Sequence, residues 1–367
     1  MVAAADVRAR VRRDVARLAH RGLSVPGFAQ AASRCLYRAV PFEGTCLLTV
    51  DPATLLPTGS LVENGLPDAA TARLTEIELG EPDVNKFTAL ARGPRPAASL
   101  GEATEGDLDR SLRQRELRRP NGFADELRAV LPSDLGSWGA LTLLRETGRP
   151  LFTPAEVAFV ASLAGVLADG LRRAALLGSG MSTAGRDASD TGLLVLAADN
   201  TIEMSNEAAG RWLDELATAG RGESGLPLAV RAAAAQARAA AAGGTAGGTG
   251  TAHARVRTRA GHWLIVRGSM LGDGPGARAA VLLEAARPAE LAPLIADAYG
   301  FTERERLVCE LVARGFPTSE IARRLHLSAY TVQDHLKSVF EKSGTGSRGD
   351  LTARLFFDHY APRLRAP

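Results

Sequence analysis

The sequence predicts an α+β protein of several domains. Its 367 residues exceed the roughly 100 to 200 residues of one ordinary domain, so we expect two or three. Short β-rich segments mixed with helical patterns run to about residue 288, and helical patterns alone follow. Two low-complexity stretches interrupt this order. Residues 178–190 have the composition of a linker, whereas residues 232–250 begin as an Ala-rich helix and end as a glycine-rich loop. We therefore expect domains at 1–177, 191–288 and 295–360.

Composition indicates a soluble globular chain with a weak basic bias at one end. Hydrophobic residues make up 46% and charged residues 23% of the chain, which is ordinary for globular proteins. From Phe301 onward there are 11 Lys/Arg and 8 Asp/Glu, a balance of +3 that equals the +3 of the whole chain. A basic C-terminal region is compatible with nucleic acid but does not by itself prove binding.

Cysteine usage and hydropathy favour a cytoplasmic protein. Cys35, Cys46 and Cys309 have no metal-type spacing and do not form an even-numbered framework. No apolar run reaches the roughly 18 residues needed to cross a bilayer, and the Arg-rich start lacks the apolar core of a signal peptide. We expect neither a membrane partner nor a metal.

The first region predicts a sheet flanked by helices. Thr45–Val50 and Trp138–Leu144 are short, β-rich and bounded by turn residues. Thr153–Glu156 is a capping box with proline in the first turn, so a helix begins there. Apolar residues then recur every three or four positions, at Val157, Val160, Ala164, Leu167 and Leu171. This stripe fits a helix packed on a sheet and a helix paired across a dimer equally well.

In its order of elements, the region from Val7 to Leu177 resembles a GAF sensor domain: entry helix, strands, a long variable middle, a WGAL strand and an exit helix. The charged middle, residues 102–122, carries no ligand signature. The resemblance implies a sensor whose exit helix, after Leu151, passes a change toward the C-terminal region.

The second region resembles a PAS domain. TGLLVLAADNTIEMSNEAAGRWL contains a strand, a turn on Asp199–Asn200, a second strand and a helix begun by Asn206. Residues 254–271, with a hairpin turn at Ala260–Gly261, and residues 279–286 supply later strands. The cysteine environment of flavin-binding PAS domains is absent. His253 and His262 are candidate haem ligands only in principle, because a lone histidine beside a strand is usually a polar surface residue. No cofactor is expected.

The third region predicts tightly connected helices. Thr302 and Glu305 form a capping box, Leu307, Leu311 and Val312 form the apolar face, and Gly315 ends the helix. A short helix, Thr318–Leu325, follows with Thr318 in the capping position. Ser328 then caps a third helix after only two intervening residues, which is helix-turn-helix geometry.

The third helix has a buried face and a separate polar face. Val332, Leu336, Val339 and Phe340 share one side, which leaves Ala329, Gln333, Asp334, Lys337 and Glu341 outside. Polar groups near a helix N-terminus, where amides and the helix dipole favour phosphates, suit a recognition helix in a major groove.

Residues 301–355 resemble the LuxR-type DNA-binding domain of bacterial regulators. T-x-R-E-R, V-A-x-G, E-I-A-x-x-L, S-x-x-T-V-x-x-H-L-K and S-R occur in order. The resemblance implies an all-α four-helix domain with its helix-turn-helix motif at 318–337 and a dimer contact through a fourth helix near 350–357. It also places His335 in the core of the motif. The DNA-binding residues it implies are Thr318, Ser328, Tyr330, Thr331, Gln333, Asp334, Lys337, Lys342 and Arg348, and the dimerisation residues are Leu351 and Leu355. Among these, Gln333, Asp334 and Lys337 would face bases, and Thr331, Lys342 and Arg348 would approach phosphates.

Two positions depart from the family pattern. Pro317 replaces the usual capping serine or threonine, so Thr318 is expected to cap. Asp334 stands where a small or apolar residue is usual. Its carboxylate could accept a hydrogen bond from cytosine N4 and bias the choice of base, or it could be solvated and paired with Lys337 or Lys342. Both interpretations stay open.

The sequence therefore predicts a homodimeric transcription regulator that binds double-stranded DNA, with RNA polymerase as a further partner left open. A response regulator would need an acidic phosphoacceptor cluster and a distant lysine, but the N-terminal region offers only Lys86. Acyl-homoserine-lactone receptors share this C-terminus but have an aromatic-rich pocket. The nucleophile, metal and phosphate-loop motifs of enzymes are absent, so no catalytic residues are expected. The alternative is a protein-interaction sensor. A closed apolar cavity would favour a small-molecule signal, and a filled core with an apolar surface patch would favour a protein.

Overall fold

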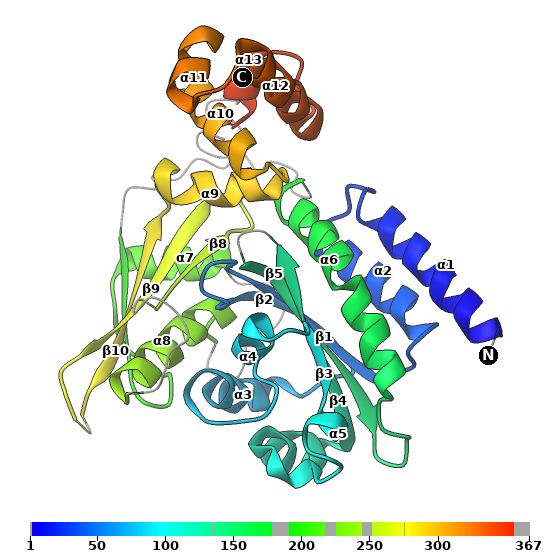
Figure 1. The fold of residues 1–367 in the computed structure, drawn as a ribbon. Coiled ribbons are helices and arrows are strands. Elements are labelled where there is room, and N and C mark those ends of the chain that lie inside the picture. Colours follow the sequence, from blue (N-terminus) through cyan, green and yellow to red (C-terminus); the bar gives the residue numbers. More distant parts are fainter. Residues whose placement is uncertain are drawn as a thin grey trace. The chain divides into compact units, whose positions relative to one another are not determined.

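The computed structural model describes residues 2–133, 136–177, 191–216, 225–243, 252–274 and 276–355. They divide into two compact units (Figure 1). Unit 1 contains both β-rich regions and ends at Ala285, and unit 2 contains the helices from Ala286 onward. The predicted linker at 178–190 and residues 244–250 of the second low-complexity stretch lie outside the described residues.

Unit 1 contains a five-stranded antiparallel sheet, called sheet A. Its strands are β1 (Gly44–Val50), β2 (Pro57–Glu63), β3 (Ala97–Ser99), β4 (Phe123–Ser133) and β5 (Gly136–Glu146). They lie in the order β2-β1-β5-β4-β3. The two strands expected from the sequence are β1 and β5, and they pair directly, with Leu47 opposite Leu141. Both faces of β4 and β5 are buried, so helices cover the sheet on each side.

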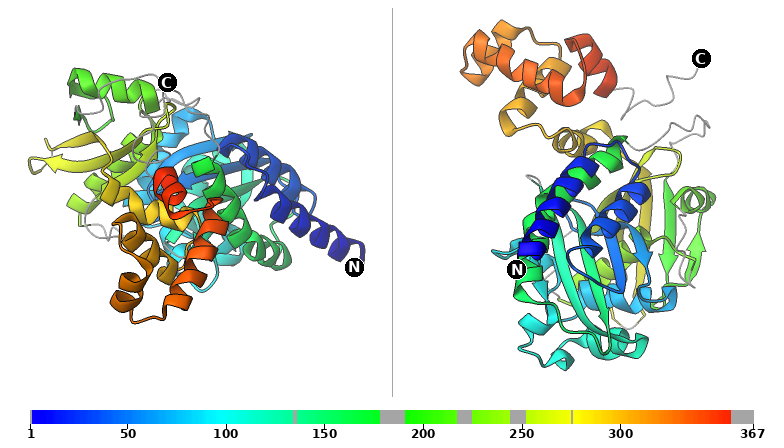
Figure 2. Two further views of the ribbon diagram at one scale, coloured as in Figure 1. Left: turned by 90° about the horizontal axis from the view of Figure 1, so that it is seen from above. Right: turned by 90° about the vertical axis from the view of Figure 1, so that its right-hand side faces the viewer.

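Three helices cover one face of sheet A: α1 (Val2–Leu18), α2 (Val25–Tyr37) and α6 (Pro154–Leu177). Figure 2 shows them side by side. Thr153 and Glu156 form the predicted capping box at the start of α6. The apolar stripe of α6 is buried among residues of sheet A, α1 and α2, so its predicted packing on the sheet is confirmed in preference to a coiled coil.

The expectation that no segment is apolar enough to cross a membrane is wrong, because one helix is long enough and apolar enough by length and composition. Within the described part of the chain, residues Pro154–Ala175 of α6 reach a mean hydropathy of 1.4 over a window that is 50% buried. The high hydropathy reflects a core helix, because Val160, Leu167 and Leu171 are 0% exposed in the core of unit 1.

The opposite face of sheet A carries shorter helices and irregular turns. They are α3 (Asp68–Gly80), α4 (Phe87–Arg92), α5 (Leu100–Ala103), η1 (Leu108–Arg110), η2 (Gln114–Arg118) and η3 (Arg119–Asn121). Since neighbouring residues of a strand point to opposite faces, Leu127 of β4 joins the core under α6, while Glu126 and Arg128 point to this second side.

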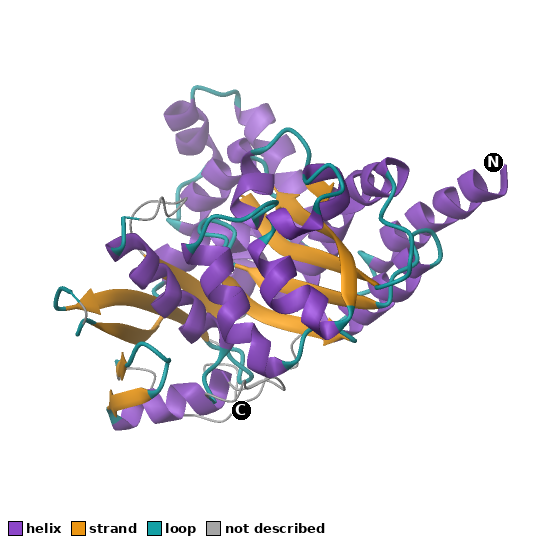
Figure 3. Ribbon diagram, turned by 90° about the horizontal axis from the view of Figure 1, so that it is seen from below, coloured by secondary structure: helices purple, strands orange, loops and turns teal. Residues whose placement is uncertain are grey.

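A second antiparallel sheet, sheet B, repeats the strand order of sheet A. Its strands are β6 (Gly192–Leu196), β7 (Ile202–Ser205), β8 (Ala252–Arg257), β9 (Trp263–Leu271) and β10 (Arg278–Ala285), in the order β7-β6-β10-β9-β8. In each sheet the second, first, fifth, fourth and third strands follow one another. Figure 3 shows the strands of both sheets flanked by helices.

The local signals of the second region are confirmed. Asn206 precedes α7 (Glu207–Leu216); its Oδ1 accepts hydrogen bonds from the amides of Ala209 (2.9 Å) and Leu193 (3.0 Å). Asn206 therefore caps the helix and holds its start against β6. Gly261, with φ of +86°, makes the predicted turn between β8 and β9. The Ala-rich segment forms α8 (Leu228–Ala241).

Helix α8 joins the two sheets within unit 1. One side packs on β8, β9 and β10, and another contacts α3 and β2. A Cβ at Gly268 of β9 would collide with the backbone of Ala233, so small residues on both elements permit this close approach. Leu56, from the β1–β2 turn, is 2% exposed in the core of sheet B. The regions of sheet A and sheet B thus pack together within unit 1.

Unit 2 is helical. It contains α9 (Pro288–Ala298), α10 (Glu303–Ala313), α11 (Thr318–Leu325), α12 (Ala329–Ser343) and α13 (Arg348–Leu355). Helix α9 spans the boundary between the second and third predicted domains and was not among the predicted elements. Residues from α10 to α13 contribute a small buried core: Val308, Leu311, Val312, Ile321, Ala322, Val332, Leu336, Val339 and Leu351.

Candidate nucleic-acid interface

Helix α10 has well-defined ends. The Thr302 hydroxyl accepts a hydrogen bond from the Glu305 amide (3.3 Å), and the Glu305 carboxylate accepts one from the Thr302 amide (2.7 Å). At the other end Gly315 has φ of +83°, and the amide of Phe316 bonds to the Leu311 carbonyl at 3.1 Å. The predicted cap and glycine stop are confirmed.

One residue of the expected apolar face of α10 lies elsewhere. Leu307 is 37% exposed, whereas Val308 is fully buried. Val308, Leu311 and Val312 follow the spacing of three and four that one helix face requires, and Leu307 falls just outside that face.

The expected cap of α11 is also wrong by one residue. Pro317 is the N-cap, with φ of −71° and ψ of 162°, and Thr318 is the first helical residue. The ring of Pro317 holds φ near the value that a cap needs, so no side-chain hydrogen bond is required for the helix to start. The Thr318 hydroxyl instead accepts a hydrogen bond from Arg348 Nη2 at 2.7 Å, and Arg348 Nη1 donates to the Phe316 carbonyl at 2.9 Å.

Thr318 and Arg348 are therefore bound to each other inside unit 2. Together they tie the start of α13 to the start of α11. Arg348 is half-buried in this position. A contact between Arg348 and phosphate, as predicted, would use the guanidinium N–H groups that these two hydrogen bonds do not use.

A short turn connects α11 to α12. His326 adopts a left-handed conformation with φ of +54°, and the Leu327 amide bonds to the Ala322 carbonyl at 2.9 Å. Ser328 then caps α12: its hydroxyl accepts a hydrogen bond from the Thr331 amide at 3.0 Å and lies 2.8 Å from the Thr331 hydroxyl. The predicted cap at Ser328 is confirmed, and the two helices pack against each other as a helix-turn-helix.

The outer face of α12 is polar and unoccupied by its own domain. Tyr330 is 73% exposed, and Gln333, Asp334 and Lys337 are exposed. Within the described part of the chain, the side chains of Gln333, Asp334 and Lys337 form no ion pair or hydrogen bond with another residue. Within the described residues Asp334 is thus paired with neither Lys337 nor Lys342, and its exposed carboxylate is open to solvent.

Lys342 forms an ion pair with a buried carboxylate of its own domain. Its Nζ lies 2.6 Å from Oε2 of Glu305, and the Ser338 hydroxyl donates to Oε1 of the same carboxylate at 2.6 Å. Burial opposes ionisation of Glu305, but the hydrogen bonds from Lys342 and Ser338 outweigh it and hold its pKa below the usual range. Glu305 therefore caps α10 and also anchors the second half of α12.

Replacing Glu305 by alanine is expected to destabilise unit 2 by about 1–3 kcal/mol, because a cap and two side-chain bonds are lost and Lys342 loses its buried partner. Amide hydrogen exchange across α10 and α12 would measure the change in the full-length protein. Glu310, exposed on the same helix and in an ion pair with the exposed Arg314, supplies a matched control as Glu310→Ala. Equal exchange in the two variants would contradict the role of Glu305.

Of the two residues expected at a dimer contact, the structure describes the side chain of Leu351. Leu351 is 1% exposed and packs inside unit 2, so its side chain supports the domain core instead of an outer surface. The period of three and four that marks a helix face does not distinguish a core from a partner. The side chain of Leu355 lies outside the described part of the structure.

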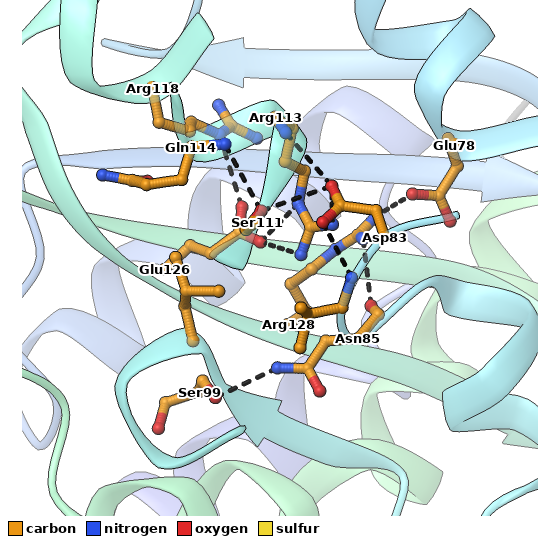
Figure 4. A network of polar contacts seen from close by, with 12 residues as sticks. Glu78, Asp83, Asn85, Ser99, Ser111, Arg113, Gln114, Arg118, Glu126 and Arg128 are labelled. Carbon is orange, nitrogen blue, oxygen red and sulfur yellow. Dashed lines mark hydrogen bonds and ion pairs between the residues drawn. The ribbon is translucent and has the colours of Figure 1, made fainter. Parts of the chain in front are cut away.

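Unit 1 contains a charged site that the sequence analysis missed. On the second face of sheet A, the buried side chains of Arg113, Arg118, Arg128 and Glu126 meet Glu78 and Asp83 (Figure 4). Arg113 Nε donates to Glu126 Oε1 at 2.6 Å, and Arg128 Nη2 donates to Glu78 Oε2 at 2.8 Å. One signal could have revealed it: Asp125, Glu126 and Arg128 are charged residues inside an otherwise apolar strand pattern.

This network borders a cavity of about 260 Å³. A second cavity, of about 220 Å³, lies on the other face of sheet A beside α2. The strands, α3, α4 and the first turn of α8 line the larger one. Its wall carries three buried guanidinium groups, those of Arg118, Arg128 and Arg231.

Comparison with known proteins identifies the family of the C-terminal unit. Residues 300–355 match the family described as bacterial regulatory proteins, luxR family. Unit 2 thus contains a LuxR-type helix-turn-helix DNA-binding domain, as the motifs predicted. No curated protein matches the chain.

Several solved structures show remote likeness. Escherichia coli SdiA is 12% identical, with 95% of this chain and 97% of that chain covered and a TM-score of 0.31. The Vibrio cholerae VqmA dimer without target DNA is 18% identical, with 48% and 88% covered and a TM-score of 0.20. A VqmA–ligand–DNA complex is 19% identical, with the same coverage and a TM-score of 0.21. Scores this low support no inference about unit 1.

Proposed function

We propose that this protein is a homodimeric, sequence-specific transcription regulator whose unit 1 senses a signal. The observation that carries the proposal is the position of α12. Glu305 and the domain core bind one side of this helix. The other side presents Gln333, Asp334 and Lys337, which are exposed and unpaired within the described residues. In this proposal Gln333, Asp334 and Lys337 face base edges, and Ser328, Tyr330 and Thr331 lie at the phosphate–sugar backbone. The sensing regions are a GAF-like module on sheet A and a PAS-like module on sheet B, and the protein acts in the cytoplasm.

Selection from random duplex DNA, followed by sequencing at several salt concentrations, tests this function. An enriched inverted repeat supports a sequence-specific dimer, and its half-site spacing reports the dimer geometry. Uniform binding that disappears with salt leaves only phosphate contact and overturns the proposal.

Replacing Asp334 by alanine is expected to change the preferred base at one position of each half-site. The carboxylate can accept from cytosine N4, and a good direct contact is worth about 1–3 kcal/mol of discrimination. Comparison of the selected sequences with those of the unmodified protein measures the change. Glu341→Ala alters an exposed acid in the second half of the same helix and should leave the preference unchanged. If both variants select the original sequence, Asp334 does not read a base.

The cavities in unit 1 favour a small molecule as the signal. A ligand controls the regulator only if it binds one arrangement of the dimer better than another. The alternative, a protein signal, is favoured by exposed apolar side chains on the edge strand β7 of sheet B and on its neighbour β6: Leu193, Ile202 and Met204 are 41%, 42% and 68% exposed. Met204→Lys separates the two, because it should abolish regulation by a protein bound at this edge and spare regulation by a ligand in the cavity.

A further inference from the structure

The lining of the larger cavity of unit 1 combines apolar side chains with arginines. Its apolar members are Leu48, Leu74, Leu79, Phe87 and Leu228. Its cationic members are Arg118, Arg128 and Arg231, and Thr71, Thr75 and Thr142 also line the cavity. Such a mixed lining suits a small molecule with a hydrocarbon body and a charged end.

Within the described residues, Arg118 is an arginine of this lining with unused hydrogen-bond donors. It is 4% exposed, and its Nε donates to Glu126 Oε2 at 3.3 Å. This is the one hydrogen bond that the described residues offer to its guanidinium, which has five N–H donors. Burial, the largest effect, lowers the pKa of Arg118, so its surroundings do not fully compensate the charge. A buried cation on a cavity wall with unfilled donors is a site for an anion.

The neighbouring acids are already engaged. Glu126 accepts the shorter bond from Arg113, at 2.6 Å, and Asp83 accepts from Arg113 at 2.7 Å. Glu78 accepts from Arg128 at 2.8 Å and from the Phe87 amide at 2.7 Å. Arg128 also lies 3.6 Å from the centre of the Phe87 ring, which fixes its orientation. Arg118 therefore has no acid of its own within the described network.

We propose that this cavity binds a small organic acid. Its carboxylate accepts hydrogen bonds from the free donors of Arg118, with the guanidinium of Arg231 adding positive charge, and its hydrocarbon part lies against Leu74, Leu79 and Leu228. A planar guanidinium matches a carboxylate by two parallel bonds. A bare inorganic anion would leave the apolar lining residues without a partner in the cavity. This inference rests on the proposed sensing function of unit 1 and names its ligand class.

The same cavity links the two sheets. Leu228 and Arg231 belong to the first turn of α8, which packs on sheet B, whereas Arg118 and Arg128 belong to the region of sheet A. A carboxylate held by Arg118 and drawn to Arg231 would favour the arrangement in which α8 closes on α3. Binding would thus be read by sheet B, which precedes the DNA-binding unit in the chain.

Matched pairs of probes test the ligand class. The full-length protein is titrated with hexanoate and hexanamide, and with phenylacetate and phenylacetamide, by calorimetry. Each pair has nearly the same shape and differs in charge. We expect the acids to bind about tenfold or more tightly than the amides, because a charge-assisted pair replaces a neutral bond. Equal binding of acids and amides, or no binding of any probe, overturns the proposal.

Variants locate the site. Arg118→Gln should remove the difference between acid and amide, and the control Arg73→Gln, a partly exposed arginine of α3 outside the cavity, should keep it. Thr71→Leu fills cavity space on a helix while leaving every arginine in place, so it should weaken all probes even if Arg118→Gln does not fold. Unchanged binding in Thr71→Leu places the probes elsewhere and refutes the site. Inorganic phosphate, if it competes with the acids at equal concentration, refutes the organic class.

The outcome is independent of DNA binding. If DNA selection enriches a site but no acid binds, the proposed ligand class is wrong and the proposed regulator function stands. If acids bind but selection enriches no site, the proposed function is wrong and the cavity remains an acid-binding site.

Discussion

Replacing Glu126 by alanine is expected to destabilise unit 1 by about 3–5 kcal/mol, because removing one partner of a buried ion pair leaves uncompensated charge. Glu126 is 0% exposed on β4 and accepts hydrogen bonds from Arg113 at 2.6 Å and from Arg118 at 3.3 Å. Without it Arg113 keeps only Asp83, and Arg118 keeps no hydrogen bond within the described residues.

Urea unfolding measured by tryptophan fluorescence reports this change. Trp138, Trp212 and Trp263 are the three tryptophans of the chain and all lie in unit 1, so the signal excludes unit 2. The control is Glu116→Ala, which removes an acid from a partly exposed ion pair with Arg73 and should leave the midpoint nearly unchanged. Similar midpoints for Glu126→Ala and Glu116→Ala would contradict the importance of the buried pair.

The same glutamate predicts a dependence on pH. Burial alone would raise the pKa of Glu126, but the guanidinium groups of Arg113, Arg128 and Arg118 outweigh burial and lower it from 4.5 to about 2. Because the folded pKa is the lower one, the unfolded state takes up the proton first. The stabilisation is complete above about pH 4.5 and is lost as pH falls toward 2. Glu126→Ala should therefore lose less stability than the unmodified protein over this interval.

Local signals predicted most of the elements. The caps at Thr153, Thr302, Ser328 and Asn206 could be predicted from the sequence. In each, the backbone N–H three residues later donates a hydrogen bond to the side-chain oxygen of the cap. Residues so near in sequence are also near in space. Strands β1, β5, β6 and β10 were readable from short β-rich runs between turn residues. The ordered motif pieces in 301–355 are specific enough to predict the DNA-binding domain from the sequence.

Contacts between distant residues were not readable. Thr318 meets Arg348 across 30 positions, and Lys342 meets Glu305 across 37, so two residues expected at phosphates are instead bound within the domain. Nothing local distinguishes a lysine that faces DNA from one that faces a glutamate of another helix. The burial of α8 depends on the partners on its two sides, and the cavity depends on arginines from a turn, a strand and α8 itself.

The joint between the two sheets gives the second large prediction. Asp51, at the end of β1, is 1% exposed and accepts three hydrogen bonds from Arg255 of β8: from its amide at 2.9 Å, from Nε at 2.7 Å and from Nη2 at 2.9 Å. Burial opposes ionisation of Asp51, but Arg255 outweighs it and lowers its pKa. Asp51→Ala should cost about 3–5 kcal/mol, since a largely buried guanidinium loses its charge partner.

A double-mutant cycle separates coupling between the sheets from damage to either one. Asp51→Ala, Arg255→Met and the double variant are compared by the same fluorescence-detected urea unfolding. If the pair joins the sheets, the double variant is less destabilised than the sum of the singles, because neither charge is then left alone. Glu203→Ala, which breaks a partly exposed ion pair with Arg278 inside sheet B, is the control and should add independently to Asp51→Ala. Strict additivity of Asp51→Ala and Arg255→Met would mean that the joint is held by the packing of α8 and Leu56 alone, and an acid in the cavity would then have to act through α8 without this ion pair.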